Sequence, residues 1–255
     1  MTFPHAVLLF GVAILAGALN SVAGGGSFFS FPALVFTGVP SIQANATNTI
    51  ALWPGSVASV GAYRNDLGDQ RRLLVILGSV SLVGGTLGAL VLLHTPPSTF
   101  TALIPWLLLL ATLLFAVGGK LTSMLREQVK SRPSSPRAAL AGIVALQFVI
   151  ALYGGFFGGG IGILMLATLG LMGMTHLHQM NAVKTVLASL INGVAVITFV
   201  LAGAIFWAQA LVMIAGSVAG GYGGAYYARK LDPRIVRWFV ILVGLGMAAY
   251  FFLKK

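Results

Sequence analysis

Long apolar segments separated by short polar connections dominate this chain and constrain what it can fold into. A helix needs about 20 apolar residues to cross the hydrocarbon core of a bilayer. Segments of that length lie at 5–23, 42–63, 73–93, 100–120, 138–157, 181–202, 208–228 and 236–253. Two shorter apolar segments, 27–38 and 161–174, each follow a glycine triplet and are short for a crossing. The pattern predicts a polytopic membrane protein in which these two segments are half-helices or re-entrant helices.

The composition excludes other classes of protein. Of the 255 residues, 58% are hydrophobic and 7% are charged, whereas soluble domains carry about 25% charged residues. Disorder is excluded because disordered chains contain few apolar residues. The absence of cysteine removes disulfides, thiolate metal sites and cysteine nucleophiles. We do not expect a cleavable signal at the N-terminus, because no basic region precedes its first apolar segment.

The net charge of +11 comes mainly from three polar stretches between apolar segments. They contain Arg64, Arg71 and Arg72; Lys120, Arg126, Lys130, Arg132 and Arg137; and Arg229, Lys230, Arg234 and Arg237. Basic loops of this kind are typical of the cytoplasmic side of a membrane protein. We therefore expect a multi-pass protein of the cell inner membrane that contacts lipid and not nucleic acid.

An internal repeat runs through the sequence. The glycine triplets 24–26 and 158–160 align, and Gln43, Asn45, Ala46 and Thr49 align with Gln179, Asn181, Ala182 and Thr185 at one offset. Gly84, Gly85, Gly88 and Ala89 align with Gly220, Gly221, Gly224 and Ala225. Because the order is collinear, we predict a first transmembrane repeat at 1–125, a basic cytoplasmic linker at 126–136 and a second transmembrane repeat at 137–255.

The charges of equivalent loops indicate that the two repeats are inverted. The connection from Arg64 to Arg72 is basic, whereas its counterpart from Ala202 to Trp207 is uncharged. The uncharged connection 94–99 corresponds to 229–237, which is basic. Equivalent loops are therefore expected on opposite sides of the membrane. The predicted fold is an all-α membrane protein of two inverted repeats, each with about five transmembrane or half-membrane helices broken at the glycine triplets.

The glycine triplets are the first candidates for a binding site. Inverted repeats often place a substrate near the membrane midplane, where the N-termini of broken helices present free N–H groups and a positive dipole end. This reasoning selects Gly24, Gly25 and Gly26 with Gly158, Gly159 and Gly160. Tight helix packing is the alternative explanation, because small residues also fill helix interfaces in membranes.

Polar residues at helical spacing are the second candidates. Asn181, Lys184, Thr185, Ser189 and Asn192 share one helical face, and Asn45, Asn48, Thr49, Ser56 and Ser59 form a similar face in the first repeat. Asn20 and Ser21 lie just before the first triplet. Hydrogen bonding between helices would account equally well for several of these side chains.

Lys184 is the strongest single indication of the substrate. A lysine at the centre of a span costs about 2.5–3.5 kcal/mol on insertion scales and is usually functional. Snorkelling to the interface is the alternative, because Lys184 lies near the start of its segment. The acidic residues Asp66, Asp69, Glu127 and Asp232 all lie in connecting loops. An apolar span with a lysine and no carboxylate favours an anionic substrate over a cation.

Metal and enzyme sites are not indicated. His176 and His178 form a pair without further ligands nearby, so we predict no metal site. The nucleophile, zinc-protease and nucleotide-binding motifs of common enzymes are missing. We therefore predict no catalytic residues and no cofactor.

Two stretches resemble a known family. Residues 16–52 (AGALNSVAGGGSFFSFPALVFTGVPSIQANATNTIAL) and 154–192 (GGFFGGGIGILMLATLGLMGMTHLHQMNAVKTVLASLIN) are similar to the paired motifs of the sulfite exporter TauE/SafE-like permeases. The resemblance covers nearly the whole chain and implies a helical permease of two inverted repeats for sulfite, sulfoacetate or similar anions. By position it implicates Gly24–Gly26, Thr47 and Asn48 in the first motif, and Gly158–Gly160, Lys184 and Thr185 in the second.

These observations predict a permease that exports a small sulfur-containing or organic anion. Moving one charge across 100 mV is worth about 2.3 kcal/mol, so an anion leaving a negative interior moves downhill. An H⁺- or Na⁺-coupled importer and a non-transporting membrane scaffold stay open as alternatives, whereas a divalent-metal permease is disfavoured by the missing carboxylates. A monomer and a homodimer are both compatible with the sequence.

Overall fold

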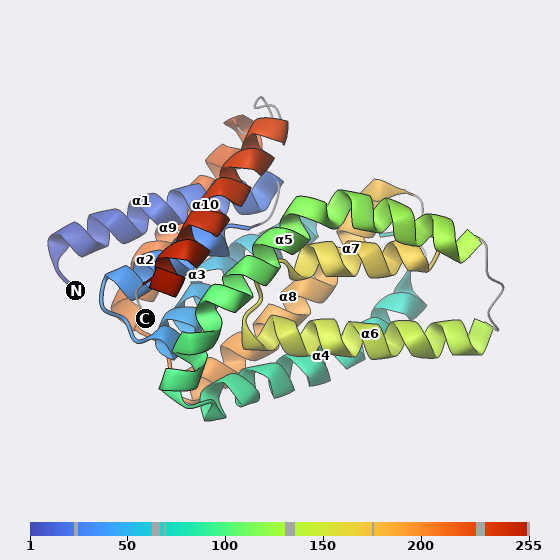
Figure 1. Cartoon of the computed structure of the whole chain (residues 1–255), viewed down its shortest axis with the longest axis horizontal. Coiled ribbons are helices and arrows are strands. Elements are labelled where there is room, and N and C mark those ends of the chain that lie inside the picture. The colour runs from blue at the N-terminus through green and yellow to red at the C-terminus, as the bar shows by residue number, and fades with distance from the viewer. Residues whose placement is uncertain are drawn as a thin grey trace.

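The computed structural model describes all residues except 23–24, 63–66, 69, 131–135, 175, 228–232 and 254–255; the side chains of 21–22, 62, 119–130, 136–139, 177, 223–227 and 233–237 are also outside the description. The described residues form helices and no strand (Figure 1). The helices are α1 (Phe3–Val22), α2 (Ser27–Phe36), α3 (Ser41–Ala62), α4 (Arg71–His94), α5 (Pro97–Lys130), α6 (Pro136–Phe156), α7 (Ile161–Leu171), α8 (Leu177–Leu201), α9 (Trp207–Tyr227) and α10 (Pro233–Leu253).

The helices follow the apolar segments of the sequence closely. Four described helical segments are long and apolar enough to cross a membrane: Phe3–Asn20, Arg71–His94, Pro97–Gly118 and His178–Leu201. The short helices α2 and α7 have 10 and 11 residues. At about 1.5 Å per residue, each is near 15 Å long, half the thickness of a hydrocarbon core of about 30 Å. An all-helical chain with spans of this kind is what the composition predicts for a membrane protein.

One element is longer than the sequence indicated. Helix α5 continues to Lys130, so residues 126–130 of the expected linker are helical. The polar residues Arg126, Glu127 and Gln128 are good helix formers and extend the helix beyond its apolar part. The division of the chain into two repeats stays a prediction.

Two helix pairs join the first part of the chain to the second through backbone contacts. Helix α1 packs on α9, and α4 packs on α6. A Cβ atom on Gly220 would overlap the carbonyl oxygen of Ile14, and a Cβ atom on Gly88 would overlap that of Leu152. Small residues at such crossings allow helices in a membrane to approach closely. Each pair therefore consists of helices far apart in sequence and held by glycine.

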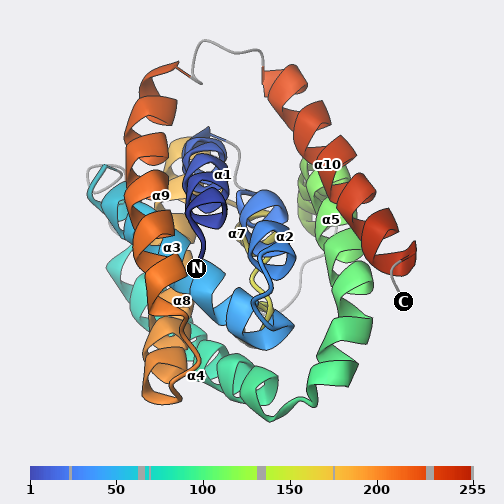
Figure 2. The same cartoon turned by 90° about the vertical axis from the view of Figure 1, so that its left-hand side faces the viewer.

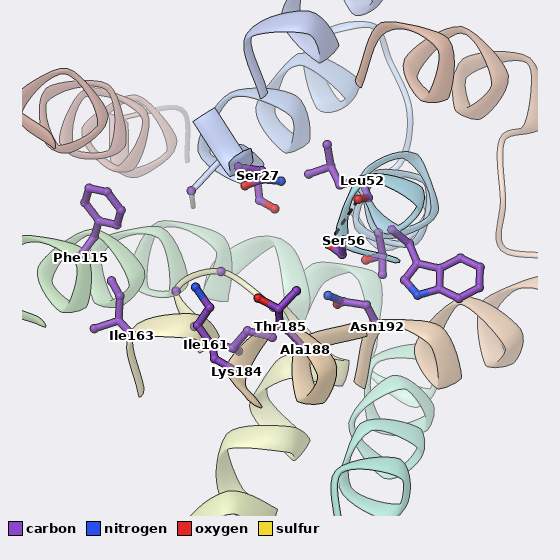
Figure 3. A pocket seen from close by; sticks show the side chains of 18 of the residues that line it. Ser27, Leu52, Ser56, Phe115, Ile161, Ile163, Lys184, Thr185, Ala188 and Asn192 are labelled. Atoms are coloured by element: carbon purple, nitrogen blue, oxygen red, sulfur yellow. Dashed lines mark hydrogen bonds between the residues drawn. The ribbon is translucent and has the colours of Figure 1, made fainter. Parts of the chain in front are cut away.

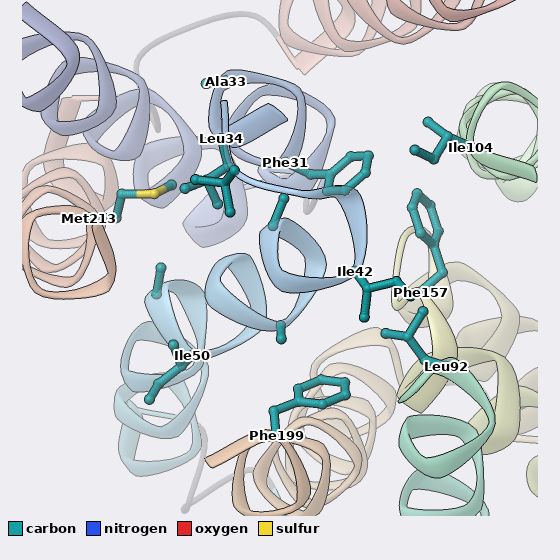
Figure 4. Close-up of a cluster of buried hydrophobic side chains, with 14 of the residues drawn as sticks. Phe31, Ala33, Leu34, Ile42, Ile50, Leu92, Ile104, Phe157, Phe199 and Met213 are labelled. Atoms are coloured by element: carbon teal, nitrogen blue, oxygen red, sulfur yellow. The ribbon is translucent and has the colours of Figure 1, made fainter. Parts of the chain in front are cut away.

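Figure 2 shows α9 on one side of the molecule and α5 with α10 on the other, with α1 and α2 between them. Beneath α2, a buried apolar cluster collects residues from helices α2, α3, α4, α5, α8 and α9 (Figure 4). Its members include Phe31 and Leu34 of α2, Leu92 of α4 and Phe199 of α8. Large apolar side chains such as Val75 and Trp238 lie exposed on the outside, where lipid would cover them.

Helix α3 is tied along its length to the later part of the chain by hydrogen bonds. The Asn45 amide donates to the carbonyl of Phe156 (3.1 Å), and the backbone N–H of Phe206 donates to the Thr47 hydroxyl (3.1 Å). The Ser217 hydroxyl donates to the carbonyl of Ala51 (2.6 Å). Buried polar groups at helix interfaces in membranes are satisfied in this way. These bonds fix the position of α3 beside α6 and α9.

Candidate functional site

A cavity of about 450 Å³ lies between α3 and α8. The first residues of α2 and α7, the glycine stretch 157–160 and Phe115 of α5 complete its walls. In Figure 3, Ser27 and Ser56 face Lys184, Thr185 and Asn192 across this space. Cavities of roughly 300–1,000 Å³ are typical of small-molecule sites. The cavity is therefore the candidate substrate site.

The structure brings most of the residues selected from the sequence to this cavity. Its lining includes Asn20, Gly25, Asn48, Gly158, Gly159, Gly160, Asn181, Lys184 and Thr185. Gly26, Asn45 and Thr47 do not line it. Gly24 and the side chain of Ser21 lie outside the described part of the chain. His176 and His178 are exposed at the start of α8 and do not line the cavity.

The glycine stretch between α6 and α7 exposes backbone donors to the cavity. Gly158 and Gly160 have φ values of 80° and 78°, which favour glycine. The Tyr153 hydroxyl donates to the carbonyl of Gly159 (2.7 Å) and holds the turn in place. Within the described part of the chain, the N–H groups of residues 159–162 have no acceptor. These groups and the positive end of the α7 dipole therefore remain available to an anion.

Lys184 adds a positive charge to the same wall. Its Nζ atom donates to the Asn181 side-chain oxygen (3.1 Å), and its aliphatic part packs over Gly162, where a Cβ atom would lie 3.4 Å from Lys184 Cδ. An ammonium group has three donors, so two remain unused. In Figure 3 the amine projects into the cavity. None of the described residues that line the cavity carries a carboxylate, so no described lining side chain neutralises this charge.

The start of α2 is closed by the protein's own polar groups. The Asn20 side-chain oxygen accepts a hydrogen bond from the Gly26 N–H (2.8 Å). The Asn48 amide donates to the Ser27 hydroxyl (3.2 Å), and its oxygen accepts from the Ser30 hydroxyl. A Cβ atom on Gly26 would overlap the carbonyl of Ala16, so this glycine serves close packing. Among the described residues, the start of α2 is therefore more occupied by internal side-chain hydrogen bonds than the start of α7.

Some cavity residues were not selected as site residues from the sequence. Trp53 of α3 and Phe115 of α5 line the cavity from helices whose rotation the sequence does not fix. Gly162 has no sequence signal, and it lies against the aliphatic part of Lys184. Asn192 was recognised as part of the polar face of α8, and that spacing was the signal that it would share a wall with Lys184.

Comparison with known proteins adds an independent finding. The family model described as sulfite exporter TauE/SafE matches residues 9–251. A probable membrane transporter protein of Haemophilus influenzae is 32% identical over 244 residues, covering 95% of this chain and 92% of the relative. The probable membrane transporter protein YfcA of Escherichia coli K12 is 29% identical over 247 residues, covering 95% and 87%. The probable membrane transporter protein ORF9 of a Sinorhizobium species is 29% identical over 257 residues, covering 97% and 92%. No solved structure matches the chain.

Proposed function

Because the chain belongs to the sulfite exporter TauE/SafE family of membrane transporters, we propose that it exports a small sulfur-containing or organic anion, such as a sulfite-like oxyanion, through the cavity between α3 and α8. The observation that carries the proposal is the wall formed by Lys184 and the free N–H groups of residues 159–162. This wall presents donors and positive charge, and none of the described residues that line the cavity carries a carboxylate to balance them.

The interaction energies favour an anion in the cavity over a cation. Two unit charges 4 Å apart interact by about 4 kcal/mol at an effective dielectric constant of 20. The insertion cost of a central lysine is about 2.5–3.5 kcal/mol. A bound anion beside Lys184 therefore offsets the cost of placing that lysine in the membrane. A cation would meet the opposite sign of interaction and the positive end of α7.

The direction of transport follows from the membrane potential. A monoanion that leaves the cell gains about 2.3 kcal/mol per 100 mV, and a dianion gains about twice as much. Export from the inner membrane then needs neither an ATPase module nor an ion gradient. In this proposal, the short helices α2 and α7 meet at the substrate, and inverted repeats rock around it to open the cavity to either side.

The test is anion flux into and out of proteoliposomes under an imposed potential. Labelled sulfite should move with the potential in wild type, and Lys184→Gln should lower the initial rate. Arg72→Gln is the matched control, because Arg72 is exposed at the start of α4 and does not line the cavity. The proposal is wrong if sulfite, thiosulfate and sulfoacetate all fail to move, or if both variants behave alike. Flux that stops when an H⁺ or Na⁺ gradient is collapsed at fixed voltage would indicate a coupled importer instead.

A further inference from the structure

The cavity is longer than a sulfite-like anion needs. Along α8 its lining runs from Asn181 past Lys184 to Asn192. Lys184 and Asn192 are separated by about 12 Å along the axis, at 1.5 Å per residue. The Lys184 amine leans toward Asn181 and away from Asn192, so a ligand that contacts both residues through hydrogen bonds of about 3 Å each spans at least about 6 Å between its own polar atoms. A bare oxyanion held at Lys184 leaves the Asn192 end unfilled.

Asn192 differs from the other polar side chains of the cavity. It has no hydrogen bond in the described part of the chain, whereas each of the others has at least one. Its side chain points into the cavity, and its oxygen lies 3.9 Å from where a Cβ atom on Gly158 would sit. An amide carries two donors and an acceptor, all of which remain for a ligand. The Asn192 side chain is half-buried, so its amide is accessible from the cavity, and one hydrogen bond to a ligand group is worth about 0.5–1.5 kcal/mol.

An aromatic wall stands beside this amide. Trp53 packs against Gly193, where a Cβ atom would lie 3.2 Å from the indole ring. The indole N–H already donates to the carbonyl of Ser189 (3.1 Å), so the ring offers an apolar surface and no donor to the cavity. Among the described residues that line the cavity, Lys184 is the one basic side chain. The Asn192 end therefore suits a neutral polar group attached to a carbon chain, and not a second anion.

Resting on the proposed anion transport, we propose that Asn192 is a specificity-determining residue that binds a neutral polar group, such as a hydroxyl or an amide, on the tail of an organic anion whose charged head lies at Lys184 and residues 159–162. The substrate class is then an organic monoanion with a polar group at least about 6 Å from its charge, the span left by the two hydrogen bonds. Trp53, which contacts Ser189 and Gly193, supplies an apolar surface for the tail at the Asn192 end.

The experiment compares three probes in a binding assay with purified protein: sulfite, butane-1-sulfonate and 4-hydroxybutane-1-sulfonate. In wild type, the hydroxylated sulfonate should bind about 3- to 10-fold tighter than the alkyl sulfonate, the gain typical of one hydrogen bond. This comparison needs no variant. In Asn192→Leu, the advantage should disappear while the affinity for sulfite stays unchanged. Thr198→Val is the matched control, because it removes a polar group from α8 outside the cavity.

The outcomes separate this inference from the proposed function. Equal affinities of the two sulfonates in wild type, or an advantage that persists in Asn192→Leu, would overturn the role of Asn192. Sulfite binding that depends on Lys184 in the same experiment would leave the anion proposal standing. If none of the three probes binds to wild type, and Lys184→Gln behaves like wild type, the proposed function itself fails.

Discussion

The starts of α2 and α7 occupy aligned positions in the two parts of the chain but differ in what faces the cavity. At the offsets of the sequence repeat, Asn48 aligns with Lys184, and Ser30 aligns with Leu164. Asn48 is held by the hydroxyls of Ser27 and Ser30, and it completes a closed network of neutral groups. Lys184 has only the Asn181 oxygen as an acceptor in the described part of the chain.

The difference shows how one arrangement can serve two purposes. At α2, the polar groups of the network form hydrogen bonds with one another, and these bonds position the helix. At α7, the aliphatic Leu164 offers no hydroxyl, so the Lys184 ammonium and the N–H groups of residues 159–162 remain free for a ligand. We infer that α2 gives structural support and that α7 supplies most of the binding energy for the anion. The following variants test that division, from the largest expected effect to the smallest.

Lys184→Asn makes the second position like the first and should have the largest effect. The loss of a charge interaction worth about 4 kcal/mol at an effective dielectric constant of 20 predicts a transport rate roughly 10²- to 10³-fold lower. The initial rate of sulfite flux in proteoliposomes measures this. Asn48→Ala should lower flux far less, because Asn48 carries no charge. A larger loss in Asn48→Ala than in Lys184→Asn would reverse the assignment of the two positions.

Glycine-to-alanine variants at the starts of α2 and α7 test the comparison by their effects on protein stability and on anion binding. Gly26→Ala forces a Cβ atom onto the backbone of Ala16, and overpacking of this kind costs about 1–3 kcal/mol or more. Gly160→Ala has room, with its nearest neighbour at 3.5 Å, and costs only the left-handed backbone conformation, about 1–2 kcal/mol. Gly26→Ala should therefore lower the thermal denaturation midpoint more, while Gly160→Ala should weaken anion binding more. If the two variants lowered the denaturation midpoint equally and weakened anion binding equally, the two glycine stretches would have the same role.

The smallest effects are expected from removing the hydroxyl group at position 30 and from introducing one at position 164. Ser30→Ala removes one hydrogen bond from Asn48 and should lower the free energy of unfolding by about 1 kcal/mol without changing anion affinity. Leu164→Ser places a hydroxyl at the position aligned with Ser30. Because Leu164 packs against an apolar cluster and does not line the cavity, this variant should change anion affinity by less than about tenfold, the limit for one hydrogen bond. Calorimetry of sulfite binding measures the second effect. A larger loss of affinity in Leu164→Ser than in Lys184→Asn would show that Lys184 is not what binds the anion.

The helices were largely predictable from the sequence. The expected segment 73–93 corresponds to α4, Arg71–His94, and 27–38 and 161–174 correspond to α2 and α7. The length of each apolar segment and the glycines that interrupt the sequence determine these helices locally, because a helix in a membrane must satisfy its own backbone hydrogen bonds. The inverted relation of the two repeats rests on loop charges, and the two basic loops, 64–72 and 229–237, lie partly outside the described residues.

The site was less predictable, because it depends on how helices rotate against one another. Asn45, Thr47 and Asn48 lie close together on α3, yet only Asn48 lines the cavity. Asn45 turns to the end of α6 and Thr47 to the start of α9. No periodicity in the sequence distinguishes these three directions, since the partners belong to distant segments. On α8, by contrast, Asn181, Lys184, Thr185 and Asn192 share the cavity wall as their spacing predicted, whereas Ser189, expected on the same face, does not line the cavity.

The pairing of α1 with α9 and of α4 with α6 has a consequence for how the chain is made. When α1 enters the membrane during synthesis, the partner that fits its small-residue face has not yet been translated. Helices α1 and α4 therefore contact lipid until their partners, α9 and α6, have been synthesised and inserted. Neither part of the chain can complete its packing alone, so a severed gene should yield a functional protein only when both fragments are produced in the same membrane.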